Sequence, residues 1–282
     1  MHPGDRRNGP AEPRERPQVS IVIPNHNYAR FLPACLRSIA DQRLDTRRIE
    51  IIFVDDASSD GSAELAQRLL PDMPLAGHRV LCLPRTGRPG PVRNAGLDQA
   101  RGLTLLCLDP DDLILPDFLP RCLEALDRGA DVAYTDHFLE DHSGRHEVRL
   151  PGFHKLLLAN QNILSTSALF RRELWDQGAR FRAATFYEDW DFWIQLALAG
   201  ARFVRLAEPL YVYRFHESNY SFSARPRDAE SKARLVLDNA AFFPSWTLGW
   251  ARGVLRGEPW ADPMARGIIP VLPEQAARPV AV

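Results

Sequence analysis

The sequence predicts an α/β protein with a mostly parallel, Rossmann-like sheet and helices on both of its faces. Short apolar runs typical of buried strands alternate with segments whose apolar residues recur at helical spacing. Such alternation favours a parallel sheet covered on both sides. The apolar runs lie at 19–23, 50–54, 79–83 and 105–108, and a polar segment follows each of them. Because open α/β sheets bind ligands at the carboxyl ends of their strands, these polar segments form the candidate site.

Composition narrows the class of protein. The 282 residues are 45% hydrophobic, which suffices for one large domain and a tail. A net charge of -1 gives no overall field that would attract nucleic acid or an anionic membrane. No apolar stretch reaches the roughly 18 residues of a membrane span, and we see no signal-peptide core, so we expect a cytoplasmic protein. Widely spaced cysteines predict buried thiols in a reducing compartment; they are Cys35, Cys82, Cys107 and Cys122.

The chain begins with a polar arm, and its first strand follows. Residues 1–17 are rich in Arg, Pro and Gly, and we expect them to be disordered. The strand is expected to end at Pro24, which cannot donate a ladder hydrogen bond. Asn25 and Asn27 follow in a polar loop, which is either a simple turn into a helix at 31–40 or one wall of a ligand pocket. The loop lacks a G-x-G-x-x-G motif, which argues against a dinucleotide-binding dehydrogenase.

Two carboxylates follow the second strand. Asp55 and Asp56 come directly after the apolar run, where a carboxylate is suited to accept from a nucleobase N–H or from ribose hydroxyls. A few residues later, Ser59 or Asp60 is suited to cap the helix that begins near Ser62. The two roles are compatible because they concern different residues.

A basic loop follows the third strand. Residues 84–96 are rich in Gly and Pro and contain Arg85, Arg88 and Arg93. Arginines near a carboxylate-rich turn fit a diphosphate bound between the two. For Arg93 a structural role is an equally good alternative, in which it and Asn94 hold the acidic turn by ion pairing. A helix is expected to begin at Asn94.

The fourth strand ends in a strongly acidic turn. Asp109, Asp111 and Asp112 follow the apolar run, and Pro110 is expected to stop the strand. Like charges this close repel unless a cation joins them, and oxygen ligands on a short turn suit Mg²⁺ or Mn²⁺. The alternative is an acidic turn that starts the next helix, with Asp112 or Asp117 as its cap.

The second half of the chain carries two further groups of polar residues. Three histidines at 137–149 raise the possibility of zinc, but their irregular spacing favours an exposed hairpin. Glu188 and Asp189 stand at the start of an aromatic helix. They are either acids favoured by the helix dipole, or a general base whose pKa is poised by partial desolvation. His216 is either a surface histidine or a nitrogen ligand that completes the metal site.

The tail carries a helix at 228–242 and an aromatic segment with arginines at 242–255. Aromatic residues with arginine suit a membrane surface that carries a lipid-linked acceptor. We favour the alternative, in which this segment packs on its own domain or on a second subunit.

Six segments, taken in this order, resemble the family 2 glycosyltransferases of the GT-A fold. They lie at 19–38, 50–62, 93–96, 108–112, 188–189 and 213–216, and the resemblance covers about residues 18–222. The expected organisation is therefore a disordered arm at 1–17, a glycosyltransferase domain at 18–222, and a helical or irregular extension at 223–282.

The resemblance implies roles for single residues. Asp109 and Asp111 match the ends of the D-x-D motif, Asp189 matches the catalytic base, and Glu188 positions it. The expected metal ligands, for Mn²⁺ or Mg²⁺, are Asp109, Asp111, Asp112 and His216. The residues expected to bind the nucleotide sugar are Pro24, Asn25, Asn27, Asp55, Asp56, Arg88, Arg93 and Asp109, with Asp56 on the base.

The resemblance also implies a reaction. One sugar would move, with inversion, from a nucleoside-diphosphate sugar to a hydroxyl of a glycan, a lipid-linked sugar or a small molecule. The Q-x-x-R-W signature of processive synthases is missing after Glu188 and Asp189, which favours a single transfer. Two alternatives remain: a nucleotidyltransferase of similar fold, and a catalytically silent nucleotide-sugar-binding protein.

Overall fold

A computed structural model describes residues 16–217, 219, 227–261 and 268–271. Most of the predicted disordered arm, residues 1–15, lies outside these ranges. In the described part of the chain, the strands form one mixed sheet in the order β3-β2-β1-β4-β8-β6-β9-β5, with β7 beside β6. The strands are β1 (Val19–Asn25), β2 (Ile49–Asp56), β3 (Gly77–Leu83), β4 (Thr104–Cys107), β5 (Leu113–Ile114), β6 (Val132–Asp141), β7 (Gly144–Val148), β8 (Leu169–Arg171) and β9 (Phe203–Arg214).

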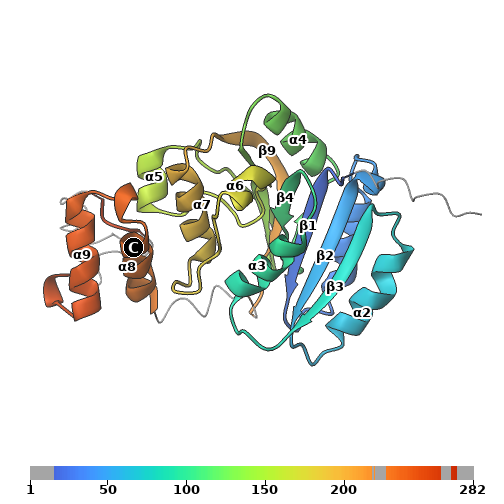
Figure 1. Ribbon diagram of the computed structural model, residues 1–282, viewed down its shortest axis with the longest axis horizontal. Coiled ribbons are helices and arrows are strands. Elements are labelled where there is room, and N and C mark those ends of the chain that lie inside the picture. Colours follow the sequence, from blue (N-terminus) through green and yellow to red (C-terminus); the bar gives the residue numbers. More distant parts are fainter. Residues whose placement is uncertain (1–15, 218, 220–226, 262–267, 272–282) are drawn as a thin grey trace, which may run out of the picture.

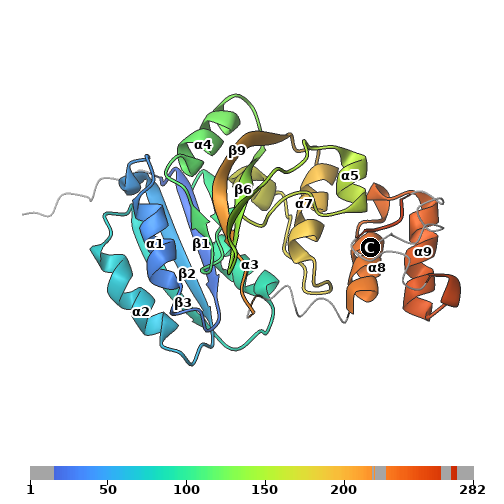
Figure 2. The same cartoon turned by 180° about the vertical axis from the view of Figure 1, so that it is seen from behind.

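Helices cover both faces of the sheet, as predicted (Figures 1 and 2). One face packs against α1, α2 and α4, and the other packs against α3 and α7. Each face of the sheet thus has its own hydrophobic core. Strands β1 and β2 are buried on both sides, and their alternate residues face one core or the other. The helices are α1 (Leu32–Ala40), α2 (Ser62–Leu69), α3 (Pro89–Gln99), α4 (Phe118–Asp127), α5 (Lys155–Asn160), α6 (Arg172–Asp176), α7 (Glu188–Leu198), α8 (Asp228–Asp238) and α9 (Ser245–Arg256).

The expected end of the first strand at Pro24 is wrong, since β1 continues to Asn25 and Pro24 pairs with Val54 of β2. The backbone of Val22 bonds toward β4, where its carbonyl accepts from Leu108. By the two-residue repeat of a strand, Pro24 faces the same side. The pairing with β4 ends at Val22, so the missing N–H of Pro24 interrupts no ladder there.

The basic loop is shorter than predicted. Helix α3 begins at Pro89 rather than at Asn94, so the loop spans only 84–88. Proline is favoured at the first position of a helix because its missing N–H would have no partner there.

Later in α3, Gly96 lies close to the sheet. A Cβ at this position would come within 2.4 Å of Val22 Cγ1 and 2.9 Å of Val54 Cγ2.

The second half of the sheet contains the antiparallel pairs. Strand β8 runs antiparallel to β4 and β6, and β9 runs parallel to β6. The polar segment with three histidines forms the predicted hairpin of β6 and β7, which turns at His142 and Ser143 and enters β7 at Gly144, whose φ is +123°. Asp117 stands at the N-cap position of α4 but makes no capping bond. Its carboxylate pairs with Arg43 instead.

The tail lies at the end of the molecule opposite β2 and β3 (Figure 1). Helices α8 and α9 pack on each other, and Trp250 and Phe242 belong to the same core cluster as α3 and α7.

Cys35, Cys107 and Cys122 are buried, as expected, whereas Cys82 is exposed because β3 is an edge strand. No helix among the described residues is long and apolar enough to cross a membrane.

Candidate functional site

The carboxyl ends of β1, β2 and β4 open into a cavity of about 1390 Å³. Parallel pairing brings Asn25 opposite Asp55, and the acidic turn follows β4 at the same edge of the sheet. The sequence-predicted residues that line the cavity are Pro24, Asn25, Asn27, Asp56, Arg88, Arg93, Asp109, Asp111, Asp112, Glu188 and Asp189. Asp55 and His216 are not among the lining residues. They hydrogen-bond to Asn25 and Asp111, which are.

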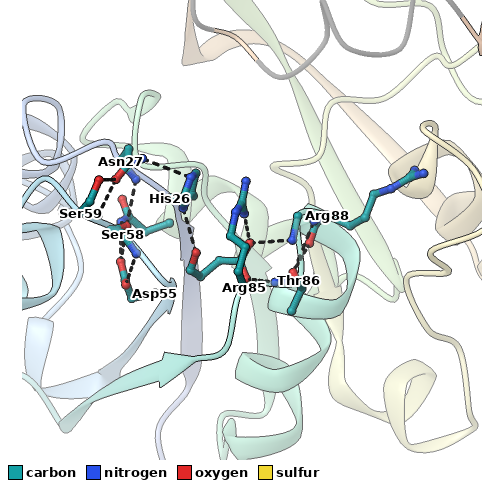
Figure 3. A network of polar contacts seen from close by, with 11 residues as sticks. His26, Asn27, Asp55, Ser58, Ser59, Arg85, Thr86 and Arg88 are labelled. Carbon is teal, nitrogen blue, oxygen red and sulfur yellow. Dashed lines mark hydrogen bonds and ion pairs between the residues drawn. The ribbon is translucent and has the colours of Figure 1, made fainter.

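Asp55 holds two loops of the site together (Figure 3). Its carboxylate accepts from Asn25 Nδ2 at 2.9 Å and from the backbone N–H of Ser58 at 2.8 Å. Asn27, with a φ of +60°, accepts from the Ser59 N–H at 2.8 Å. The N-cap of α2 is Gly61, not Ser59 or Asp60 as the sequence had suggested, although Asp60 Oδ1 accepts from the Ser62 N–H at 3.1 Å.

Asp56 is contacted by the basic loop. Its carboxylate pairs with Arg85 and accepts from the N–H groups of Thr86 at 2.5 Å and Gly87 at 3.1 Å. Burial favours the neutral acid, but these N–H groups outweigh it and lower the pKa of the Asp56 carboxyl below its ordinary value. The backbone carbonyl of Asp56 also lies 2.8 Å from His26 Nδ1. Figure 3 shows Arg88 extending away from Arg85 and this network.

The three aspartates of the acidic turn have different partners. Asp109 accepts from Arg93 Nη2 at 2.8 Å and 3.1 Å. Asp111 Oδ2 lies 3.1 Å from His216 Nε2. Asp112 is almost fully buried, and its carboxylate accepts from the Tyr211 hydroxyl and from a backbone N–H of β9. The carboxylates therefore do not converge on one point through these contacts.

Burial makes ionisation of the turn costly. Desolvation, followed by the charge of Asp109, raises the pKa of Asp111 to about 7. Desolvation and the neighbouring carboxylates also raise the pKa of Asp112 well above its ordinary value. Asp111 Oδ2 receives one further donor, Asn219 Nδ2 at 3.2 Å. A cation at Asp111 would offset this penalty.

Arg93 links the turn to the start of α7. Its guanidinium is buried and donates both to Asp109 and to Glu188 Oε1, the latter at 2.7 Å. This is the ion pairing that the sequence left open as an alternative to phosphate binding. Desolvation raises the pKa of Glu188 to about 7 even though Arg93 opposes the shift. Asn94 bonds to the backbone of Phe181, so it does not contact the turn through these bonds.

Asp189 faces the cavity from the first turn of α7, where the helix dipole favours a negative charge. Its Oδ2 accepts from Asn162 Nδ2 at 3.0 Å and from Thr166 Oγ1 at 3.4 Å. Burial nevertheless raises the pKa of the Asp189 carboxyl. A partly accessible carboxylate with a raised pKa, fixed by two side chains, is suited to accept a proton.

Several residues of the cavity were not predicted from the sequence. The signal for some was present: the polar stretch before β8 supplies the two partners of Asp189. For the others no local signal existed, because only folding brings them to the cavity. The missed lining residues with polar contacts to the site include Asn162, Thr166, Asn219, Tyr211 and Asp228.

The sequence model described as glycosyl transferase family 2 matches residues 20–186, which is more than half of the chain. The chain belongs to this family. Among its relatives, the succinoglycan biosynthesis protein ExoO of Rhizobium meliloti is 29% identical, over 73% of this chain and 63% of its own length. The uncharacterized glycosyltransferase YwdF of Bacillus subtilis is 28% identical, over 78% of this chain and 82% of its own.

Solved structures share the fold of this family 2 glycosyltransferase. TarS of S. aureus in complex with UDP-GlcNAc has a TM-score of 0.66 at 21% identity, over 89% of this chain and 74% of that one. The mannosyltransferase PcManGT of Pyrobaculum calidifontis, in complex with GDP-Man and Mn²⁺, has a TM-score of 0.60 at 21% identity. The match covers 80% of this chain and 65% of that one. The GT-A architecture expected from the sequence is thereby confirmed.

Proposed function

We propose that this glycosyltransferase transfers one sugar from a nucleoside-diphosphate sugar to an acceptor hydroxyl, with inversion and with the help of a divalent cation. One observation carries the proposal: the acidic turn and Asp189 line the same cavity. Pockets for single small molecules usually span about 300–1,000 Å³. A cavity of about 1390 Å³ has room for a donor and part of an acceptor together.

Asp189 is the proposed general base. It would take the proton of the attacking hydroxyl, while Asn162 and Thr166 hold the carboxylate in place. Glu188 is tied to Arg93, so it is poorly placed to act as a covalent nucleophile. With Glu188 held by Arg93 and Asp189 acting as a base, direct displacement is favoured, which inverts the configuration at the anomeric carbon.

The acidic turn fits a hard divalent cation held jointly with the donor. Asp111 and His216 offer an oxygen and a nitrogen ligand about 3 Å apart, and burial penalises the Asp111 charge until a cation offsets it. Within the described ranges, no three His, Cys, Asp or Glu side chains are arranged to hold a metal by themselves. Mg²⁺ is usually bound by one or two carboxylates together with substrate phosphates. When bound, the ion would offset charge on the departing diphosphate.

The neighbours' ligands support the donor class. The solved complexes of TarS and PcManGT contain UDP-GlcNAc and GDP-Man, and the second also contains Mn²⁺. We therefore propose a uridine or guanosine diphosphate sugar as the donor. Its base would lie near Asp56, and Arg85, which now pairs with Asp56, would have to yield part of that contact.

The proposal is tested by thermal-shift screening of UDP- and GDP-sugars with and without Mn²⁺, followed by turnover assays. A bound ligand stabilises the folded state according to its affinity. We expect stabilisation by one nucleotide class, and release of nucleoside diphosphate that EDTA abolishes. Release of pyrophosphate would indicate a nucleotidyltransferase, and stabilisation without turnover of donor would indicate a silent binding protein. No stabilisation by any nucleotide sugar would overturn the proposal.

A further inference from the structure

Two arginines flank one aromatic ring on the α7 side of the cavity. The Arg88 Cζ lies 3.8 Å from the ring centroid of Phe186, and the Arg227 Cζ lies 6.0 Å from the same centroid. Phe186 and Arg88 line the cavity, and Arg227 immediately precedes α8. An arginine stacked on an aromatic face keeps its N–H edges available to other groups.

Neither arginine is paired with a carboxylate among the described residues. Toward the described residues, the guanidinium of Arg88 makes one long hydrogen bond, at 3.4 Å, from Nη1 to the carbonyl of Thr185. The nearest acid in sequence to Arg227 is Asp228, and both of its oxygens are used elsewhere. One accepts from the Tyr187 hydroxyl and the other accepts from Lys232 Nζ at 2.7 Å.

Lys232 is important for this charge balance. Its side chain is only 1% exposed and forms an ion pair with Asp228, so the charges of these two residues offset each other. Two guanidinium groups near one ring repel each other, and within the described part of the chain neither forms an ion pair that would offset this. An arrangement of this kind is suited to a ligand that carries negative charge, which paired arginines bind through charge-assisted, bidentate hydrogen bonds.

We propose that the acceptor of this enzyme carries a phosphate or carboxylate group, and that Arg88 and Arg227 bind it beside Phe186. The inference rests on the proposed function. Phe186 stands three positions before Asp189, so an anion held there lies on the side of the cavity from which the base acts. The cation that would be held jointly with the donor diphosphate is assigned to Asp111 and His216, which belong to other elements.

This subsite joins Arg88 and Phe186, which lie inside the segment matched by the family model, to Arg227, which follows it. The family match ends at residue 186, and Arg227, Asp228 and Lys232 follow it. Helix α8 is attached to the segment before Asp189 by several contacts: Thr185 Oγ1 donates to the Ser231 carbonyl at 3.0 Å, Asp228 accepts from Tyr187, and Arg182 Nη1 donates to the Asp238 carbonyl at 3.1 Å. The extension would thus contribute Arg227 to selection of the acceptor, beside Arg88 and Phe186 of the matched segment.

The test uses the full chain saturated with Mn²⁺ and with the nucleoside diphosphate that stabilises it, UDP or GDP. Calorimetric titrations then compare glycerol 1-phosphate with glycerol, and glucuronate with glucose. We expect one anion to bind at least about tenfold more tightly than its neutral counterpart, and to weaken at high salt. Whether the phosphate or the carboxylate binds identifies the source of the charge. If neither anion binds better than its neutral counterpart, the inference is wrong.

Variants locate the site. Arg227→Gln and Arg88→Gln should each weaken the anion at least about tenfold, since a charged hydrogen-bonding partner is lost. Arg234→Gln is the matched control, because Arg234 lies on α8 but pairs with Glu230, and it should change nothing. Weaker nucleotide binding by Arg227→Gln or by Arg88→Gln would mean that the substituted arginine serves the donor, which would overturn the inference. Absence of nucleotide binding to the wild type would instead refute the proposed function itself.

Discussion

Arg93 donates to Glu188 Oε1 at 2.7 Å, although 95 positions separate the two residues in the chain. The same guanidinium donates to Asp109, so one buried cation joins α3, the acidic turn and the start of α7. The acidic turn carries the proposed metal ligand, and the start of α7 carries the proposed base. A single side chain therefore connects the two parts of the proposed active site.

Removal of Arg93 should destabilise the protein severely. In Arg93→Gln the carboxylate of Glu188 loses its cation, and breaking a buried ion pair typically costs about 3–5 kcal/mol. Urea denaturation should register this loss. Arg93→Lys should recover only part of it, because an ammonium lacks the planar fork that reaches both acids. A change below about 1 kcal/mol in Arg93→Gln would show that the link contributes little.

Asp189→Asn should abolish most of the turnover without loss of donor binding. General bases contribute about 10²- to 10⁴-fold, so kcat should fall by that factor. The amide keeps the shape of the side chain, and the thermal shift induced by the nucleotide sugar should match that of the wild type. Equal turnover by a variant that still binds donor would remove Asp189 from the mechanism.

Asp111 and Asp112 should respond differently to substitution. Asp111→Asn should raise the Mn²⁺ concentration needed for half-maximal turnover by at least about tenfold, because the proposed ligand is lost. Asp112→Asn disturbs the contacts with Tyr211 and the β9 backbone, so its main effect should be about 1–3 kcal/mol of stability. If Asp112→Asn raised the metal requirement as strongly, Asp112 would be a ligand, as the resemblance implied.

Asp191 should make stability depend on pH. It is fully buried, and desolvation raises its pKa from 3.8 to about 6, although Asn239 and Arg182 oppose the shift. The folded state then holds a proton on Asp191 more tightly than the unfolded state does. The resulting contribution to the free energy of unfolding is complete below about pH 4 and is lost as pH rises through about 6. Relative to wild type, Asp191→Asn should gain about 1–2 kcal/mol between about pH 5 and pH 7.5. Parallel stability curves for the two proteins would contradict the shift.

Two helical glycines form a matched pair for testing the packing of α3. Gly96→Ala places a methyl group against Val22 and Val54, and overpacking of this kind costs about 1–3 kcal/mol. Gly249→Ala in α9 meets no atom within 4 Å and should stabilise by about 0.5–1 kcal/mol through helix propensity. Thermal unfolding of both variants tests the expectation, and equal shifts for the two would contradict it.

Local signals predicted much of the fold and part of the cavity. Runs of apolar residues mark strands wherever both faces are buried, and this is why β1, β2 and β4 could be read directly. The polar residues after such strands reach the cavity because parallel strands end at one edge. Pro24 was misread because the effect of a proline depends on whether a neighbouring strand needs its N–H, which is a property of the sheet.

The sequence by itself determined the α/β class, the acidic turn after β4 and the acids that begin α7, since each depends on residues that are close along the chain. Only the tertiary structure decided which partner each charge has: Arg93 between Asp109 and Glu188, Asp112 turned to Tyr211, and Lys232 neutralising Asp228. The reason is physical. Burial makes an unpaired charge costly, and the group that relieves this cost is set by distance in space, not by separation in sequence.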